Sequence, residues 1–297
     1  MTQARLSDDR SIRILDGGTG SELRRRKIPL SEHCWSAVAN LTHAELLTRI
    51  HEDFIRAGAD IVTANTFATS RFVLASAGLD AQFEEINRAA ITAARHAAES
   101  ADREIAVAAS LSCLPPSFGA AAWPEPDAES DAYAELAACF VDNGADLILL
   151  EMMQDAEHAP RACRAARASG LPFWIGLSCR LDRNGRLVAL DSPGQSFAEV
   201  LDAVLPFEPE GIAVMHSPID AIDPALAELA ARWAGPLGAY AEAPYAEDPA
   251  VSRSEPIDAA GYASAARGWL ERGATLVGGC CGTTPAHIAA LRALVAG

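Results

Sequence analysis

Residues 42–65 read THAELLTRIHEDFIRAGADIVTAN and combine the signals of a helix, a glycine stop and a strand. The spacing of Thr42 and Glu45 has the form of a capping box, which predicts a helix that begins there and runs towards Arg56. Gly58 suits the left-handed position that follows a last helical turn. The apolar run after it is typical of a parallel strand buried on both faces. The stretch therefore predicts one helix–strand unit.

The same device recurs at residues 143–146 (NGAD) and 272–275 (RGAT), and alanine-rich helical segments separate short apolar runs along the whole chain. Repeated βα units favour a parallel sheet with right-handed crossovers, which closes naturally at eight strands. An open doubly wound sheet is the alternative, and the strand count decides against it. We expect an α/β fold, a (β/α)₈ TIM barrel forming a single domain over residues 1–297. The eight predicted strands are Ile12–Asp16, Asp60–Asn65, Ile105–Leu111, Asp146–Glu151, Phe173–Ser178, Gly211–His216, Pro236–Tyr240 and Ala274–Gly279.

The composition excludes several classes of partner. The 297 residues include 24 basic and 40 acidic side chains, and the formal charge of −16 would repel nucleic acid and anionic lipid. No apolar run is long enough to span a membrane, and the first residues lack the apolar core of a signal peptide. We therefore expect a cytoplasmic protein. In that reducing compartment its seven scattered cysteines would be buried thiols, nucleophiles or metal ligands.

Two long connections are rich in proline, alanine and acidic residues. They span residues 115–130 and 241–256 and leave the carboxyl ends of predicted strands, where barrel enzymes place their chemistry. They could form lids, the contacts of a homo-oligomer, or ordinary surface loops.

Residues 277–285 read VGGCCGTTP and give the strongest chemical signal. Successive side chains of a strand point to opposite faces, so Cys280 and Cys281 can meet on one ion only where the flanking glycines allow unusual backbone angles. Thr284 can cap a following helix with Pro285 in its first turn, and the positive potential there favours thiolates. A packed or oxidised cysteine pair without metal is the plainer alternative. A phosphate cradle is a poorer one, because two thiols occupy the loop.

The segment GGCCGTTPAHI, residues 278–288, is similar to the zinc-binding signature of homocysteine S-methyltransferases. Three further motifs resemble that family in the same order: ILDGGTG at 14–20, AGADIVTANTF at 57–67 and GADLILLE at 144–151. The resemblance implies a barrel that binds one Zn²⁺ through three cysteines, with an open position for the acceptor's thiolate.

This chain departs from the family at the third ligand. Met215 and His216 stand where the family has Asn-Cys at the end of the sixth strand. Imidazole is a normal zinc ligand, so we predict a site of His216, Cys280 and Cys281 whose net charge is zero instead of −1. Such a site should acidify a bound thiol more strongly. Otherwise His216 merely fills space, and Cys179 at the end of the fifth strand is the substitute ligand.

The resemblance also implies that Asp16 and Glu151 bind the ammonium group of an amino-acid acceptor. We expect Gly17 to bind the substrate as well, and Thr66, at the end of the second strand, to orient the acceptor. Taken singly, either carboxylate could instead cap a helix or pair with an arginine, and Thr66 could simply end a strand. His43, His51 and His287 lie on predicted helices, and we expect them to be solvated.

Two loops depart from the family pattern. Residues 240–244 read YAEAP where Tyr-Pro-Asn is usual, and residues 110–115 read SLSCLP where a glycine-proline turn is usual. The resemblance predicts methyl transfer from a sulfonium donor, S-methylmethionine or S-adenosylmethionine, to homocysteine or a related small thiol or selenol. The alternatives are another donor or acceptor, selected by the altered loops around Cys113 and Glu242, and a catalytically silent barrel that binds an amino acid.

Overall fold

The computed structural model describes residues 11–113, 123–192, 194–243 and 256–297. All eight predicted strands are present, and neighbours pair in parallel in the order β1-β10-β9-β8-β5-β4-β3-β2. The strands are β1 (Arg13–Ile14), β2 (Ile61–Ala64), β3 (Ala106–Ser112), β4 (Leu147–Met153), β5 (Phe173–Leu177), β8 (Gly211–Met215), β9 (Leu237–Tyr240) and β10 (Ala274–Val277).

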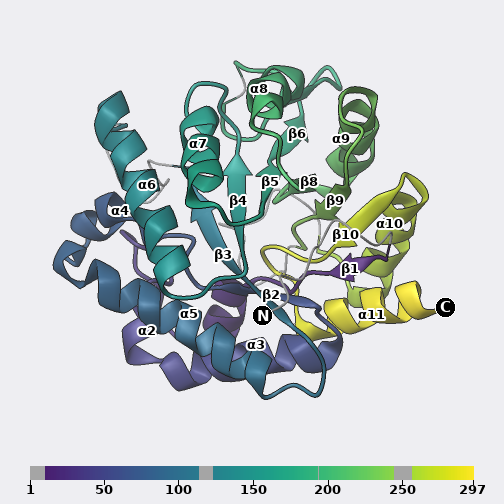
Figure 1. Cartoon of the computed structure of the whole chain (residues 1–297). Helices are drawn as coiled ribbons and strands as arrows, with labels where there is room; N and C mark the ends of the chain where they lie inside the picture. The colour runs from purple at the N-terminus through teal and green to yellow at the C-terminus, as the bar shows by residue number, and fades with distance from the viewer. Residues whose placement is uncertain (1–10, 114–122, 193, 244–255) are drawn as a thin grey trace.

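The two ends of the sheet meet. Leu15 and Ile61 form a parallel bridge, and the backbone N–H of Asp16 donates to the carbonyl of Ile61 at 3.0 Å. The N–H of Asp60 donates to the carbonyl of Ile14 at 2.7 Å. These bonds join β1 to β2, so the sheet closes on itself, as predicted, and the open-sheet alternative is wrong (Figure 1).

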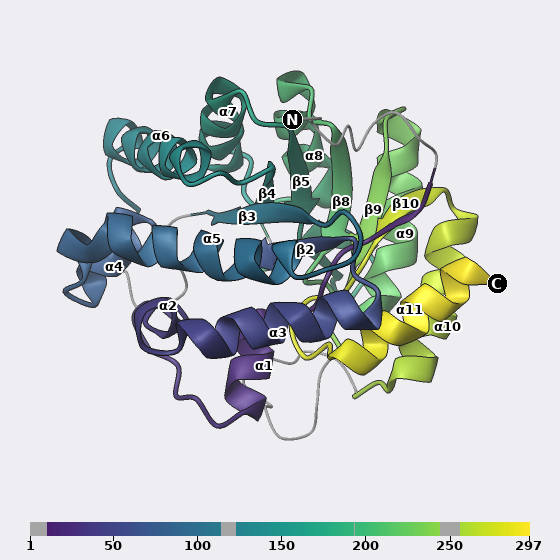
Figure 2. The same cartoon turned by 60° about the horizontal axis from the view of Figure 1, so that its bottom comes forward.

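Helices connect the strands and surround them (Figure 1). The last helix packs against the first long one, so the outer ring also closes, and Figure 2 shows α11 meeting the end of α3. The helices are α1 (Thr19–Arg25), α2 (Ala39–Thr42), α3 (Ala44–Ala57), α4 (Arg71–Ser76), α5 (Phe83–Glu99), α6 (Pro126–Asp142), α7 (Ala159–Ser169), α8 (Phe197–Val204), α9 (Ile219–Arg232), α10 (Ala259–Glu271) and α11 (Pro285–Ala296).

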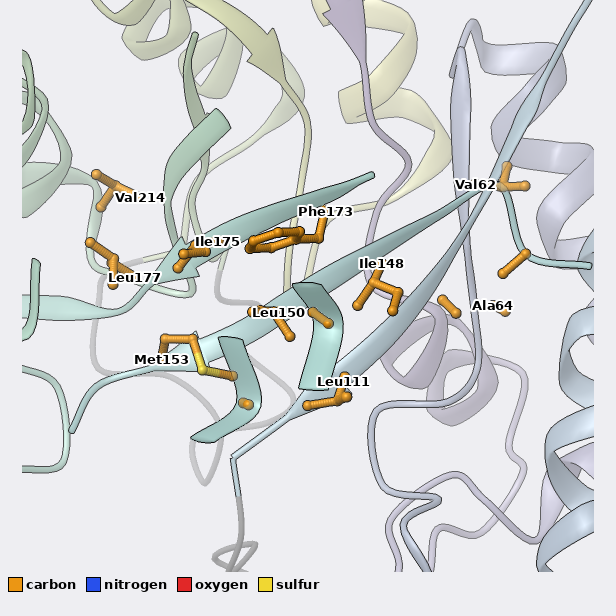
Figure 3. Close-up of a cluster of buried hydrophobic side chains, with 14 of the residues drawn as sticks. Val62, Ala64, Leu111, Ile148, Leu150, Met153, Phe173, Ile175, Leu177 and Val214 are labelled. Atoms are coloured by element: carbon orange, nitrogen blue, oxygen red, sulfur yellow. The ribbon is translucent and has the colours of Figure 1, made fainter. Parts of the chain in front are cut away.

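The apolar residues of the strands divide into two layers by simple alternation. Leu147 and Leu149 of β4 belong to a small cluster inside the barrel. Ile148 and Leu150 point outward into the large cluster between strands and helices (Figure 3). All four side chains are buried, and the burial of each stabilises the fold by about 1.5–3 kcal/mol. Since both faces of the strand are buried, its sequence is a continuous apolar run.

The glycine stops are confirmed, but the capping box is not. Gly58, Gly144 and Gly273 have φ values of 112°, 78° and 93°, a region that other residues rarely adopt. Thr42 does not cap α3, because it is the last residue of α2 and its hydroxyl donates to the carbonyl of Val38. The residue before α3 is His43, which makes no capping hydrogen bond.

A two-stranded hairpin follows β5 and was not predicted. Its strands are β6 (Cys179–Leu181) and β7 (Leu187–Ala189), paired antiparallel outside the barrel sheet. Most of the connections at residues 115–130 and 241–256 lies outside the described residues, so the predicted lid or oligomer contact stays a prediction. Within the described part of the chain, no helix is long and apolar enough to cross a membrane.

Candidate metal centre and active site

A cavity of about 460 Å³ opens at the carboxyl ends of the barrel strands. Strand ends that are far apart in the sequence supply its wall, because a closed parallel barrel brings all of them to one mouth. Six of the predicted site residues line it, namely Asp16, Gly17, Glu151, His216, Cys280 and Cys281.

The three predicted metal ligands converge on one wall of this cavity. His216 directly follows β8, and the two cysteines follow β10. One ligand atom from each of His216, Cys280 and Cys281 lies within 4.8 Å of the other two, and Nδ1 of His216 is 3.4 Å from Sγ of Cys280. The sequence placed His216 and the cysteine pair at the ends of two different strands, and the structure brings them together.

Backbone hydrogen bonds hold the cysteine loop. The N–H of Cys280 donates to the carbonyl of Ala241 at 3.1 Å, and the carbonyl of Cys281 accepts from Ala243 at 2.8 Å. A Cβ on Gly279 would lie 2.2 Å from Oγ1 of Thr283, so only glycine fits at that position. Both cysteines therefore face the cavity through a loop whose close packing requires glycine.

His216 adopts an unusual backbone conformation. Its φ is 42°, which is uncommon for a residue with a side chain. Its N–H donates to the carbonyl of Tyr240 at 3.2 Å, and this bond to β9 helps to hold it. Local strain of this kind concentrates at functional sites, and here it turns the imidazole towards Cys280.

The donor set fits a zinc ion. Zn²⁺ binds cysteine sulfur at about 2.3 Å and imidazole nitrogen at about 2.0–2.1 Å in tetrahedral geometry, so ligand atoms lie roughly 3.5–4 Å apart. The 3.4 Å between Nδ1 of His216 and Sγ of Cys280 is close to that spacing. Cys179, the substitute ligand, is outside this cluster: it is fully buried, and its sulfur accepts a hydrogen bond from the hydroxyl of Ser217.

The same groups are strongly coupled in their protonation. A hydrogen bond from Cys280 holds the pKa of Cys281 well below its usual range, and burial opposes this effect. Burial lowers the pKa of His216, but the thiolate of Cys281 and the carboxylates of Glu242 and Asp191 outweigh it and raise this pKa to about 9. Metal binding would therefore release protons, because thiolates and neutral imidazole are the ligand forms.

Asp16 lies on another wall of the cavity and is buried. Its carboxylate accepts hydrogen bonds from the N–H of Thr63 at 2.8 Å and from the Thr63 hydroxyl at 2.9 Å. Burial nevertheless dominates and raises the pKa of Asp16 to about 8, with a further contribution from Glu151. A carboxylate in this position is stabilised by a cationic partner.

Glu151 lies on β4 beside the same cavity. The hydroxyl of Ser110 donates to its carboxylate, and burial raises the pKa of Glu151 to about 7. Two further carboxylates, Asp191 and Glu242, line the cavity, whereas its described lining contains no lysine or arginine. The cavity is therefore suited to cationic ligands.

Thr66 does not line the cavity. Its hydroxyl donates to the carbonyl of Ser110 and accepts from the Ser110 N–H, both at 2.9 Å. Through these bonds it fixes the residue whose side chain binds Glu151. Cys113 also lies outside the cavity lining, where its thiol is 3.3 Å from Sδ of Met153.

Several lining residues were not predicted. Asn65 hydrogen-bonds to Ser36, which precedes α2, and to Asn40 within α2, and these bonds anchor both against the end of β2. Thr63 and Asp191 also face the cavity. Thr63 could have been found, since it is a polar residue in an apolar strand next to the site. The prediction that the helical histidines are solvated is wrong for His51 and His287, because both are buried.

The family model described as homocysteine S-methyltransferase matches residues 13–295. The chain belongs to this family. Within it, the chain is similar to homocysteine S-methyltransferase 1 of Zea mays, with 23% identity across 96% of this chain and 94% of that protein. It is similar also to homocysteine S-methyltransferase YbgG of Bacillus subtilis, with 24% identity across 93% and 91%. The methionine synthase of Mycobacterium tuberculosis matches with 28% identity, but the chain spans only about a quarter of its length.

Solved structures support the same fold. The metallated form of the homocysteine methyltransferase MmuM from Escherichia coli superposes with a TM-score of 0.79, at 24% identity and over 96% of this chain and 97% of that one. Its apo form gives a TM-score of 0.74 at 23% identity. These structures show that the chain shares its fold with MmuM.

Proposed function

We propose that this chain transfers a methyl group from a cationic sulfonium donor to the thiol of homocysteine or of a related small thiol or selenol. The observation that carries the proposal is that a His216–Cys280–Cys281 cluster and two buried carboxylates, Asp16 and Glu151, share one cavity. The first group suits a soft metal and the second an ammonium group, and an amino acid with a thiol needs both.

His216, Cys280 and Cys281 would hold a zinc ion. Bound there, Zn²⁺ would act as a Lewis acid that makes the acceptor's thiolate available near neutral pH. The residues contribute by their charge: two thiolates and a neutral imidazole balance the ion, so the site does not repel an incoming anion as three thiolates would.

Asp16 and Glu151 would bind the ammonium group of the acceptor. Thr63 holds the Asp16 carboxylate from two sides, and Ser110 holds that of Glu151. Thr66 would act indirectly, since its hydroxyl holds the backbone of Ser110, whose side chain binds Glu151. With its ammonium group anchored, the acceptor would direct its sulfur towards the cysteine loop.

The donor is cationic in this proposal. Four carboxylates line the cavity and its described lining contains no lysine or arginine, which favours a sulfonium amino acid such as S-methylmethionine or S-adenosylmethionine over a polyanionic donor. In the transfer, the acceptor's sulfur forms a bond to the methyl carbon while the bond from that carbon to the sulfonium sulfur breaks. The electron pair leaves with the sulfonium sulfur, so both products are uncharged thioethers at sulfur. The cavity contributes by orienting and desolvating the two reactants.

A matrix of donors and acceptors tests the proposal. Purified protein with measured zinc content would be incubated with S-methylmethionine or S-adenosylmethionine and with homocysteine, selenohomocysteine or cysteine, and methylated products would be identified by mass spectrometry. We expect methionine from homocysteine with at least one donor. Zinc-loaded protein that methylates none of the acceptors would contradict the proposal and would favour a silent amino-acid-binding barrel.

A further inference from the structure

His51 is an unusual buried residue. It lies on α3, its side chain is fully buried, and neither ring nitrogen has a hydrogen-bond partner. Most buried polar groups are hydrogen-bonded, so an imidazole with two unpartnered nitrogens points to an interaction that forms only in another state of the protein.

The nearest carboxylate belongs to the active site. Nδ1 of His51 is 4.0 Å from Oδ2 of Asp16, which is too far for a hydrogen bond but within reach of a small side-chain rotation. His51 and Phe54 lie one turn apart on α3, and a Cβ on Gly17 would be 2.8 Å from the Phe54 ring. The same face of α3 therefore packs against both Asp16 and the residue after it.

Hydrogen bonds in functional sites are often long in the free protein and shorten when substrate binds. We propose that His51 is a positioning residue for the acceptor site, whose Nδ1–H donates to Oδ2 of Asp16 when the acceptor's ammonium group binds that carboxylate. This inference rests on the proposed function, because it takes the ammonium group as the ligand of Asp16.

A neutral donor suits this position better than a charged one. Burial lowers the pKa of His51 to about 4, so the imidazole is neutral near pH 7. A neutral N–H can orient a carboxylate without cancelling the negative charge that the ammonium group needs. The groups that face Asp16 from other elements are Thr63 on β2 and the carboxylate of Glu151 on β4. Among the described residues, Asp16 is the carboxylate within 4.0 Å of His51.

Two substitutions separate the hydrogen bond from the packing. His51→Leu fills similar space without a donor, and His51→Asn keeps an N–H close to the position of Nδ1. We expect His51→Leu to raise KM for homocysteine about tenfold or more, as loss of a hydrogen bond to a charged group does, with a much smaller change in kcat. His51→Asn should recover most of this loss. Leu47→Ala, a buried change one turn earlier on α3, should lower the melting temperature and leave KM unchanged.

A second readout does not depend on turnover. The pKa of Asp16 can be followed by carbon NMR of its carboxyl group in zinc-loaded protein with and without homocysteine. We expect His51→Leu to raise that pKa by about one unit when homocysteine is bound, matching the tenfold effect on KM. Unchanged KM and pKa in His51→Leu would overturn the inference. A wild-type protein that binds no homocysteine would refute the proposed function and with it this inference, whereas homocysteine binding that is equally tight in wild type and His51→Leu would overturn the role of His51 alone.

Discussion

Asp16→Asn gives the most informative pH profile. Because the pKa of Asp16 is raised to about 8, roughly one tenth of the free protein carries the ionised carboxylate at pH 7. Binding an ammonium group requires that form, so ionisation costs about 1.4 kcal/mol at pH 7 and almost nothing at pH 9. The ionisation of Asp16, taken by itself, should therefore raise kcat/KM for the acceptor about tenfold between pH 7 and pH 9.

The variant removes this dependence. Asparagine keeps the shape of the side chain and carries no charge, so Asp16→Asn should lower kcat/KM at pH 9 by about 10- to 150-fold, the range for a hydrogen bond to a charged group. The ratio of wild-type to variant kcat/KM cancels the titration of the acceptor's own thiol and ammonium groups. Initial rates at subsaturating homocysteine, measured from pH 6.5 to 9.5, give that ratio. A ratio that stays flat over this range would refute the assignment of Asp16.

The same shift affects stability. The pKa of Asp16 is higher in the folded protein than the ordinary value of 3.8, so the bound proton stabilises the folded state at low pH. That stabilisation is complete below about pH 4 and is lost as pH rises towards 8. Asp16→Asn should gain stability relative to wild type between pH 5 and pH 9, as measured by urea unfolding without ligand. A difference that does not change with pH would contradict the raised pKa.

Three other substitutions test neighbouring parts of the account. Gly279→Ala should abolish zinc retention in a folded protein, because the added Cβ would lie 2.2 Å from Oγ1 of Thr283, and elemental analysis with circular dichroism checks both statements. Cys179→Ala should leave zinc content unchanged, and a loss of zinc would restore that residue as a ligand. Arg161→Met should destabilise the protein by about 1.5–3 kcal/mol, since its guanidinium hydrogen-bonds to the fully buried Glu129, which keeps Tyr133 and His158 as partners; calorimetry with an unshifted melting temperature would contradict this.

The barrel was predictable because the signals for it are local. Each strand is a short apolar run, and the glycine after a helix, as at Gly58, marks where the next strand begins. The hairpin of β6 and β7 was missed, although Asn184-Gly185 between its strands is a typical hairpin turn. The predicted capping box at Thr42 is wrong because Thr42 ends the short helix α2, which the spacing of Thr42 and Glu45 does not indicate.

The site was predictable where it follows strand ends and less so elsewhere. Asp16, Glu151 and His216 could be placed at one mouth because a parallel barrel collects the carboxyl ends of its strands. The burial of His51 could have been foreseen from helical spacing, because Leu47, Ile50, Phe54 and Ile55 form the buried stripe of α3 and His51 lies on that stripe. Asp191 reaches the cavity through the unpredicted hairpin connection.

The metal centre is tested most directly by measuring which atoms surround bound zinc. Zinc X-ray absorption on the purified protein, combined with elemental analysis, should give about one zinc per chain with two sulfur ligands and one imidazole nitrogen from the protein. His216→Ala should lose most of the zinc, and His216→Cys should retain it with a third sulfur. Zinc retained by His216→Ala, or a wild-type spectrum without an imidazole contribution, would contradict the three-residue site on which the proposed chemistry depends.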